Sequence, residues 1–481
     1  MSEPTTIVNL QAAINSGSKS CTIIVDHYLK EIASQAHLNT FLEVFEAGAK
    51  IQAVEVDKKM KNGTSGKLAG CVIAIKDNIC YKGHHVSASS KILEGFKSLY
   101  SSTVVEHLLE EDAIIIGRLN CDEFAMGSSN ENSAYGNVPN PVNNAHVPGG
   151  SSGGAATAVK AGLCHAALGT DTGGSIRQPS SLCDVVGFKP TYGRVSRHGI
   201  IAYASSFDQV GPITTSVEDT ALIMEVIAGK DSWDSTVSSL EVPCYSELLQ
   251  TAGPRKIGYL TDCLESKGLD EEIKQGLLSQ VERLRAAGHV VEPVDFPYLD
   301  YLVPAYYVLT TAEASSNLAR YDGIHYGYRS EHGDSLGATY KASRTEGFGT
   351  EVKRRIMLGT FVLSSGYYDA YYTKAQKVRR VIQDETSKIL NQYEFILLPT
   401  TPTTAPVIGE NIDDPIAMYL EDIFTVQANL AGLPAISLPL GKHSNGLPFG
   451  IQLIGNKFEE AALLSFSNEM CQNQGALLSV V

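Results

Sequence analysis

The chain has 481 residues, of which 43% are hydrophobic and 19% are charged. This composition excludes a disordered chain, a collagen-like chain and a simple coiled coil, and the length suffices for one large α/β unit or for two to four domains. Lys and Arg total 38 against 53 Asp and Glu, so the formal charge is −15. Such a surface repels phosphate backbones, and we do not expect this chain alone to be a major binding surface for nucleic acid.

Cysteine usage and hydropathy indicate the compartment. No apolar run reaches the roughly 18 residues that a membrane span needs. The first 21 residues lack the basic and apolar regions of a signal peptide. The nine cysteines are an odd number, and none belongs to a Cys-x-x-Cys pair. We therefore expect a cytoplasmic protein with reduced thiols and no membrane contact.

Taken in chain order, the predicted elements alternate between strands and helices. Strand patterns occupy residues 71–75, 113–116, 165–168, 256–260, 290–294, 395–398 and 451–454. Helical patterns occupy residues 23–36, 103–110, 155–161, 269–287, 351–390 and 459–470, and the Pro-Thr-rich residues 399–406 read as a loop. The alternation predicts the α/β class. Because composition does not change sharply at any point, we expect one domain over residues 1–481.

Two loops rich in glycine and serine carry the strongest chemical signal. They are Gly149-Gly-Ser-Ser-Gly-Gly154 and Gly169-Thr-Asp-Thr-Gly-Gly-Ser-Ile-Arg177. Glycines let the backbone turn sharply and point successive N–H groups into one concavity, which suits a phosphate or the oxyanion of an acyl transfer. Neither loop has a nucleotide-binding glycine motif, so the oxyanion is the better interpretation.

A serine nucleophile needs a base, because a hydroxyl attacks poorly while it keeps its proton. None of the twelve histidines lies in either loop. Lys76 follows the apolar run Cys71–Ile75, and a lysine desolvated at the end of a buried strand can serve as a base. The alternative is that the Lys76 stem packs at the core edge while its ammonium reaches water or pairs with Asp77.

Together these residues resemble the amidase signature family. The resemblance continues through residues 186–194 and 205–212 and covers nearly the whole chain. Within the family, residues 346–356 and 363–372 are similar to the glutaminase branch, which serves tRNA-dependent amidotransferases. The resemblance implies the amidase-signature fold, a central mixed β-sheet flanked by helices on both faces, with a catalytic core at approximately residues 66–215.

The family uses a Ser-cisSer-Lys triad. Carried over by position, the acyl-ester nucleophile is Ser175, the bridging cis-serine is Ser151 and the base is Lys76. The resemblance further implies an oxyanion hole made by the backbone N–H groups of Thr172, Gly173, Gly174 and Ser175. A competing interpretation takes Ser152 as the nucleophile, because Gly150–Gly154 also fits the Gly-x-Ser-x-Gly elbow.

In the glutaminase branch an arginine binds the substrate α-carboxylate and an aspartate binds its α-amino group. By position these are Arg355 and Asp422, with Tyr306 as a further pocket residue. A planar guanidinium matches a carboxylate, which suits a zwitterion such as glutamine. The alternatives are a surface helix charge for Arg355 and a helix-face carboxylate beside Glu421 for Asp422.

The resemblance also implies partners. Glutamine is the expected substrate, and the ammonia passes to a partner that activates Glu on tRNA(Gln), or Asp on tRNA(Asn), with ATP and Mg²⁺. The expected assembly is a heterotrimer with amidotransferase subunits B and C, in which the partner binds most of the charged tRNA, and we expect no cofactor or metal in this chain. The alternatives are a stand-alone amidase acting on small amides and a non-catalytic scaffold protein.

Overall fold

The computed structural model describes residues 6–250, 253–410 and 415–478. The strands are β1 (Phe41–Val44), β2 (Val72–Lys76), β3 (Ile114–Leu119), β4 (Ala166–Asp171), β5 (Val186–Lys189), β6 (Gln209–Thr214), β7 (Lys256–Leu260), β8 (Val290–Val294), β9 (Phe395–Pro399), β10 (Ala435–Lys442) and β11 (Pro448–Gly455). The helices are α1 (Ile7–Asn15), α2 (Cys21–Ser34), α3 (Glu46–Asn62), α4 (Thr103–Glu110), α5 (Gly153–Lys160), α6 (Arg177–Leu182), α7 (Val217–Ile227), α8 (Thr261–Leu264), α9 (Glu271–Ala286), α10 (Leu299–Asn317), α11 (Leu336–Gly347), α12 (Thr350–Val362), α13 (Lys374–Leu390), α14 (Pro415–Leu420), α15 (Val426–Ala431) and α16 (Glu460–Leu478).

Within the described residues these strands form one eleven-stranded sheet in the order β1-β3-β2-β4-β6-β5-β10-β11-β9-β7-β8. Strand β2 runs parallel to β3 and β4, and β7 runs parallel to β8 and β9. The other neighbouring pairs are antiparallel. The predicted α/β class and its mixed sheet are therefore confirmed.

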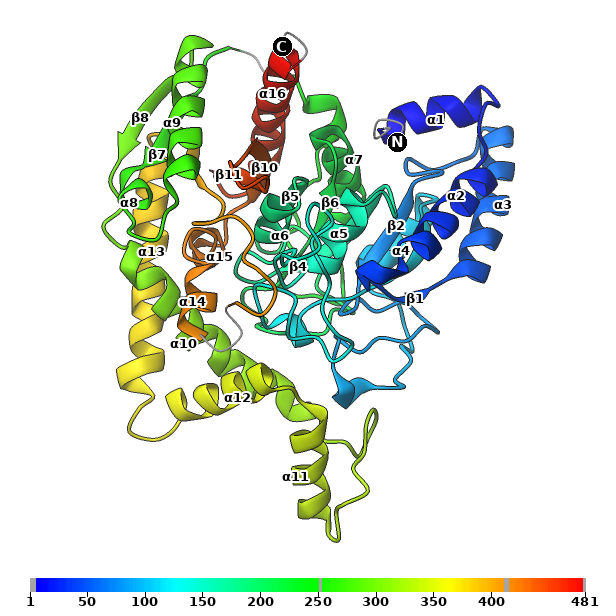
Figure 1. Ribbon diagram of the computed structural model, residues 1–481, viewed down its shortest axis with the longest axis vertical. Helices are drawn as coiled ribbons and strands as arrows, with labels where there is room; N and C mark the ends of the chain where they lie inside the picture. Colours follow the sequence, from blue (N-terminus) through cyan, green and yellow to red (C-terminus); the bar gives the residue numbers. More distant parts are fainter. Residues whose placement is uncertain (1–5, 251–252, 411–414, 479–481) are drawn as a thin grey trace.

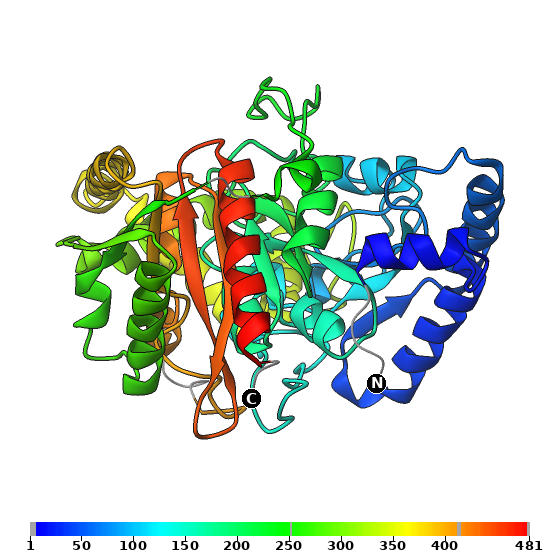
Figure 2. The ribbon, with the colours of Figure 1, turned by 90° about the horizontal axis from the view of Figure 1, so that it is seen from above.

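Helices cover both faces of the sheet. On one face, a hydrophobic core packs α4, α7, α9 and α16 against the strands. On the opposite face there are two cores. One contains α10, α13 and α15, and the other contains α2, α3 and α5. Helices α1 to α4 lie at one end of the molecule, and α11 projects from the body (Figure 1). Seen from above, α16 lies along β10 and β11 (Figure 2). No helix of the described residues is long and apolar enough to cross a membrane.

The register of β2 decides where Lys76 lies. Ile73 belongs to the core with α7, whereas Ala74 belongs to the core with α5 on the opposite face. Because successive side chains alternate between the faces of a sheet, Lys76 follows Ala74 onto the α5 face. Strand β4 runs parallel to β2, so the loop after Asp171 begins at the edge where Lys76 ends its strand.

The helix predicted over residues 351–390 is interrupted, which corrects the sequence interpretation. Helix α12 ends at Val362, and a π-helical turn, Asp369–Thr373, leads into α13. Between them Gly366 has φ +87°, a left-handed conformation that glycine adopts without strain and that a helix cannot continue. The interruption separates α12, which reaches the site described below, from α13, which packs beside α10 and α15.

Candidate active site

Lys76 lies among three hydroxyl groups. Its Nζ is 2.7 Å from Ser151 Oγ, 3.0 Å from Ser152 Oγ and 3.0 Å from Thr170 Oγ1. The residue is 0% exposed, and burial lowers the pKa of its amine from the ordinary value, which favours the neutral form. A neutral amine that donates its two N–H groups to Ser152 and Thr170 keeps its lone pair for the Ser151 hydroxyl.

The neighbouring carboxylate does not compete for this amine. Asp77 accepts hydrogen bonds from the Ser87 and Ser89 backbone N–H groups and pairs with Arg118 over 2.6 Å. Since Lys76 is also fully buried, the alternative of an ammonium that reaches water or pairs with Asp77 is wrong.

A second lysine, Lys189, is equally buried but has a different environment. Its ammonium donates to the carbonyl of Pro190 over 2.9 Å and to the carbonyl of Leu433. Burial lowers the pKa of Lys189 to about 7. Because these acceptors are backbone carbonyls, Lys76 is the buried lysine placed to take a proton from a serine.

The two serine loops meet at the backbone. The Ser152 N–H donates to the Ser175 carbonyl over 3.1 Å, and the peptide bond between Gly150 and Ser151 is cis, as the resemblance implies. A side chain at Gly150 would not fit, since its Cβ would lie 2.1 Å from Asp122 Oδ2. The chain therefore approaches the carboxylate here as only glycine permits.

Exposure separates the candidate nucleophiles. Ser151 and Ser152 are 0% exposed, whereas Ser175 is 8% exposed. The Ser152 hydroxyl also donates to the Thr170 carbonyl over 3.1 Å while it accepts from Lys76. Ser152 is thus engaged within the protein, and the arrangement favours Ser175 as the group that meets a substrate.

Asp171 organises the start of the second loop. It accepts the N–H of Gly174 over 2.9 Å and the N–H of Ile176 over 3.2 Å, and Arg177 pairs with it at 3.0 Å. Burial alone would raise the pKa of Asp171, but the Arg177 guanidinium and the hydrogen bonds lower it to about 2. The carboxylate stays ionised, so this pair supports the structure of the loop.

This arrangement changes the expected set of oxyanion donors. The N–H of Gly174 points to Asp171 and is already engaged. In the part of the chain that the structure describes, the backbone N–H groups of Thr172, Gly173 and Ser175 have no hydrogen-bond acceptor within the protein. The hydroxyl of Thr172 is held by Asp208 over 2.6 Å, which fixes this end of the loop.

Arg355 is buried among aromatic rings. It is 2% exposed, and its guanidinium carbon lies 5.5 Å, 5.1 Å and 5.5 Å from the ring centres of Tyr203, Tyr307 and Tyr419. Its Nε donates to Glu351 over 2.7 Å and its Nη1 donates to the Tyr203 hydroxyl over 2.9 Å. The alternative of a surface helix charge is therefore wrong for Arg355.

Asp422 is close to the same group of tyrosines. It is 8% exposed, and its Oδ2 accepts a hydrogen bond from the Tyr307 hydroxyl over 3.0 Å. Burial raises the pKa of Asp422 to about 7. Tyr306 lies instead against the second serine loop, because a Cβ on Gly173 would be 2.4 Å from its ring. Sequence position thus selected two groups, Arg355 and Asp422, that contact one tyrosine in space.

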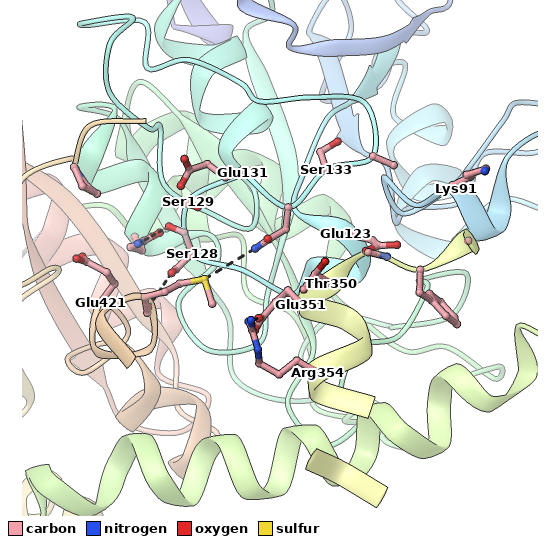
Figure 3. A pocket seen from close by; sticks show the side chains of 18 of the residues that line it. Lys91, Glu123, Ser128, Ser129, Glu131, Ser133, Thr350, Glu351, Arg354 and Glu421 are labelled. Carbon is pink, nitrogen blue, oxygen red and sulfur yellow. Dashed lines mark hydrogen bonds and ion pairs between the residues drawn. The ribbon is translucent and has the colours of Figure 1, made fainter. Parts of the chain in front are cut away.

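A cavity of about 530 Å³ adjoins these residues. In Figure 3 Glu351 and Arg354 lie together at the start of α12, on the wall of this cavity. Gln178 lines it too and accepts the N–H of Gly150 over 2.8 Å. The cavity therefore reaches the Arg355 cluster through Glu351 and the first serine loop through Gln178, and its lining does not include Lys76, Ser151, Ser175, Arg355 or Asp422. Among the described residues no group of His, Cys, Asp or Glu could hold a metal ion.

Several neighbours of the candidate residues were not predicted. Glu351 stands four residues before Arg355, a helical spacing that could have indicated their ion pair. Tyr307 follows the predicted Tyr306 directly. Thr170 lies within the second glycine-serine loop, which could have indicated it. Tyr203 reaches the site through a long-range contact with Arg355 that its sequence surroundings do not indicate.

Comparison with known proteins supports the resemblance to the amidase signature family. The family model described as Amidase matches residues 24–464. The A subunit of glutamyl-tRNA(Gln) amidotransferase from Chlorobium phaeobacteroides is 50% identical over 465 residues, covering 96% of this chain and 98% of that protein. The protein of the same name from Salinibacter ruber is 47% identical, covering 95% of this chain and 98% of its own length.

Two solved structures show the same likeness. The structure of the protein of that name from Thermotoga maritima has 42% identity and a TM-score of 0.75, covering 92% of this chain and 90% of that one. Peptide amidase from Stenotrophomonas maltophilia has 30% identity and a TM-score of 0.82, covering 98% and 97%. The family model spans most of the chain, and buried Lys76 is hydrogen-bonded to Ser151 of the first serine loop. This chain therefore belongs to the amidase family.

Proposed function

We propose that this chain is the glutaminase component of a tRNA-dependent amidotransferase. It hydrolyses the side-chain amide of glutamine and supplies ammonia to a partner that converts Glu-tRNA(Gln) to Gln-tRNA(Gln), or Asp-tRNA(Asn) to Asn-tRNA(Asn). The observation that carries the proposal is the fully buried Lys76 amine, 2.7 Å from the Ser151 hydroxyl. The amidotransferase relatives, at 47% and 50% identity over nearly the whole chain, support the choice of substrate.

The contact between Lys76 and Ser151 supports the following acylation step. Neutral Lys76 takes the proton of the Ser151 hydroxyl. Ser151 in turn takes the proton of Ser175 while the Ser175 oxygen attacks the amide carbon. The N–H groups of Thr172, Gly173 and Ser175 stabilise the oxyanion. When the tetrahedral intermediate collapses, the proton returns through Ser151 to the leaving nitrogen and ammonia departs. Water then attacks the ester by the same proton route and releases glutamate.

Recognition of glutamine uses its two charged groups. The guanidinium edge of Arg355 that Glu351 and Tyr203 leave free pairs with the α-carboxylate. Ionised Asp422 pairs with the α-ammonium group. Tyr306, which lies against Gly173, forms a wall of the proposed substrate site. The two charged groups thus hold the substrate at its α-carbon, with the amide directed to Ser175.

The remaining parts of the reaction belong to partners. In the proposed heterotrimer, amidotransferase subunits B and C accompany this chain, and the partner binds ATP, Mg²⁺ and most of the charged tRNA. The formal charge of −15 supports a tRNA site outside this chain. All nine cysteines are free thiols, which supports a cytoplasmic setting. We further propose one domain over residues 1–481, whose catalytic core at about 66–215 supplies the triad.

Co-expression tests the proposal. The chain is purified alone and with subunits B and C, and ammonia release is measured with glutamine and with simple aliphatic amides. We expect glutamine to be strongly preferred, with turnover highest in the complex and lost in Lys76→Ala. Equal turnover of simple amides by the isolated chain would instead identify a stand-alone amidase, and a complex without any glutaminase activity would identify a scaffold.

A further inference from the structure

The segment from Asp422 to Thr425 connects the proposed ammonium site to residues 172–175, here called the oxyanion loop. The hydroxyl of Thr425 lies 2.6 Å from the carbonyl oxygen of Gly173 and 3.0 Å from the carbonyl oxygen of Asp422. Thr425 is 0% exposed, so water does not compete for these bonds. A hydroxyl has one proton to donate, and the shorter distance shows that the Gly173 carbonyl is its main acceptor.

The peptide group between Gly173 and Gly174 is consequently held at both ends. Thr425 binds its carbonyl oxygen, and Asp171 accepts its N–H over 2.9 Å. A peptide group is planar, so two fixed ends fix its orientation. The N–H groups of Gly173 and Ser175, on either side of this peptide, are then directed by the same two contacts.

Packing leaves little freedom of movement for Gly174 and Thr425. Gly174 has φ +133°, and a Cβ there would lie 2.3 Å from the Thr425 hydroxyl oxygen. The Arg177 guanidinium donates to the Thr425 carbonyl over 2.9 Å and also pairs with Asp171 at 3.0 Å. One buried cation therefore holds both the segment and the loop, and a displacement of either strains the other.

We propose that Thr425 is a positioning residue that couples recognition of the substrate's α-ammonium group at Asp422 to the orientation of the oxyanion loop. The inference rests on the proposed glutaminase function and adds a specificity mechanism to it. Binding energy gained at a remote group raises the rate when it is used to orient groups that act in the transition state. Contact with the ammonium fixes Asp422, Thr425 then fixes the Gly173 carbonyl, and the oxyanion donors are aligned.

This coupling makes a distinct prediction about substrates. The glutamine analogue without the α-amino group, 4-carbamoylbutanoate, keeps the scissile amide and the carboxylate. With the wild-type chain it loses kcat as well as affinity, because the oxyanion loop is less well oriented. Without the Thr425 hydroxyl the two substrates differ much less in kcat, since the ammonium contact no longer reaches the loop.

The experiment measures steady-state ammonia release from both substrates by the assembled complex. Thr425→Val keeps the shape of the side chain and removes the hydroxyl. We expect its kcat for glutamine to fall on the order of 10-fold or more, with KM changed less than about 3-fold, and its kcat ratio between the two substrates to approach one. Thr425→Ser, which keeps the hydroxyl, restores kcat to within a few-fold of wild type.

Controls separate positioning from a purely structural role. Thr214 ends β6, and its buried hydroxyl forms a hydrogen bond with the hydroxyl of Thr220. The control variant Thr214→Val removes this hydroxyl and should leave both kcat values unchanged. If Thr425→Val does not fold, Thr425→Ala provides the same comparison.

The inference is overturned if the variant without the hydroxyl keeps the wild-type kcat. It is equally overturned if kcat falls by the same factor for both substrates, because the coupling requires the ratio between their kcat values to change. A wild-type complex that releases no ammonia from glutamine would instead overturn the proposed function and, with it, this inference.

Discussion

The hydroxyl of Tyr307 donates a 3.0 Å hydrogen bond to Asp422, and the ring of the same tyrosine packs 5.1 Å from the guanidinium carbon of Arg355. One buried side chain therefore sets the spacing between a guanidinium and a carboxyl group. A small zwitterion is the ligand class that such a pair recognises at both charges. The pair also gives the site a pH dependence, which can be tested.

The first prediction concerns binding at low pH. Burial raises the pKa of Asp422 to about 7, and only the ionised form pairs with an ammonium group. Below about pH 7 the carboxyl of the free enzyme is protonated, so kcat/KM for glutamine falls as pH decreases. In the bound complex the ammonium favours the ionised form, so Asp422 affects kcat less.

The measurement is a pair of pH profiles for wild type and Asp422→Asn. Lys76 also loses activity at low pH, because its amine must be neutral, but that effect appears in kcat as well. Asp422→Asn should have a raised KM throughout and lack the part of the acidic limb that is specific to kcat/KM. Identical kcat/KM profiles for the two proteins would contradict the assignment of Asp422.

The second prediction separates the two serine candidates. Ser175→Ala should form no acyl-enzyme with glutamine, because the attacking oxygen is missing. Ser152→Ala should still acylate, at a reduced rate, since Lys76 loses one of its hydrogen-bond acceptors. Mass spectrometry of acid-quenched complex detects the ester. Acylation that survives in Ser175→Ala and disappears in Ser152→Ala would assign the nucleophile to Ser152.

The third prediction compares two buried lysines. Lys76→Ala should lower kcat by roughly 10⁴-fold or more with little loss of thermal stability, because it removes the base together with a desolvated amine. Lys189→Met, the matched control, should lower the melting temperature, since the Pro190 and Leu433 carbonyls lose their donor, while folded enzyme keeps its kcat. Ammonia release and thermal unfolding measure both effects. Unchanged turnover in Lys76→Ala would exclude the lysine-base mechanism.

The fourth prediction tests the carboxylate site. Arg355→Lys should raise KM for glutamine on the order of 10-fold or more, because an ammonium cannot reproduce a two-pronged contact. Arg354→Lys changes the adjacent, exposed arginine and should leave KM within about 2-fold. An elevated KM in Arg354→Lys alone would show that the assignment is displaced by one residue.

Local signals predicted a large part of the fold. The strands over residues 256–260 and 290–294 were predicted with the observed bounds, because each is a short run rich in apolar and β-branched side chains. Helix α10 was not predicted: its apolar residues occupy most of its circumference and Pro304 lies inside it, so it lacks a clear amphipathic stripe. Strands β5 and β10 form their pairing over about 250 residues of sequence, beyond the reach of local pattern.

In the site too, local sequence predicts some features, whereas others depend on long-range contacts. Lys76 could be placed because its position depends on one strand and the alternation of its side chains. The direction of the Gly174 N–H could not, because it is set by a carboxylate, a guanidinium and a distant threonine that meet only in the folded chain. Motif resemblance identified Arg355 and Asp422 without indicating that Tyr307 joins them.

The placement of Lys76 on an interior strand separates it from the proposed recognition residues. Strand β2 lies between β3 and β4, so the position of Lys76, the proposed base, is fixed by strand pairing on both sides. Arg355, Asp422 and Tyr307 come from helices and connections that follow later along the chain. Substitutions among these proposed recognition residues can therefore change which amide is accepted without disturbing the strand that carries Lys76.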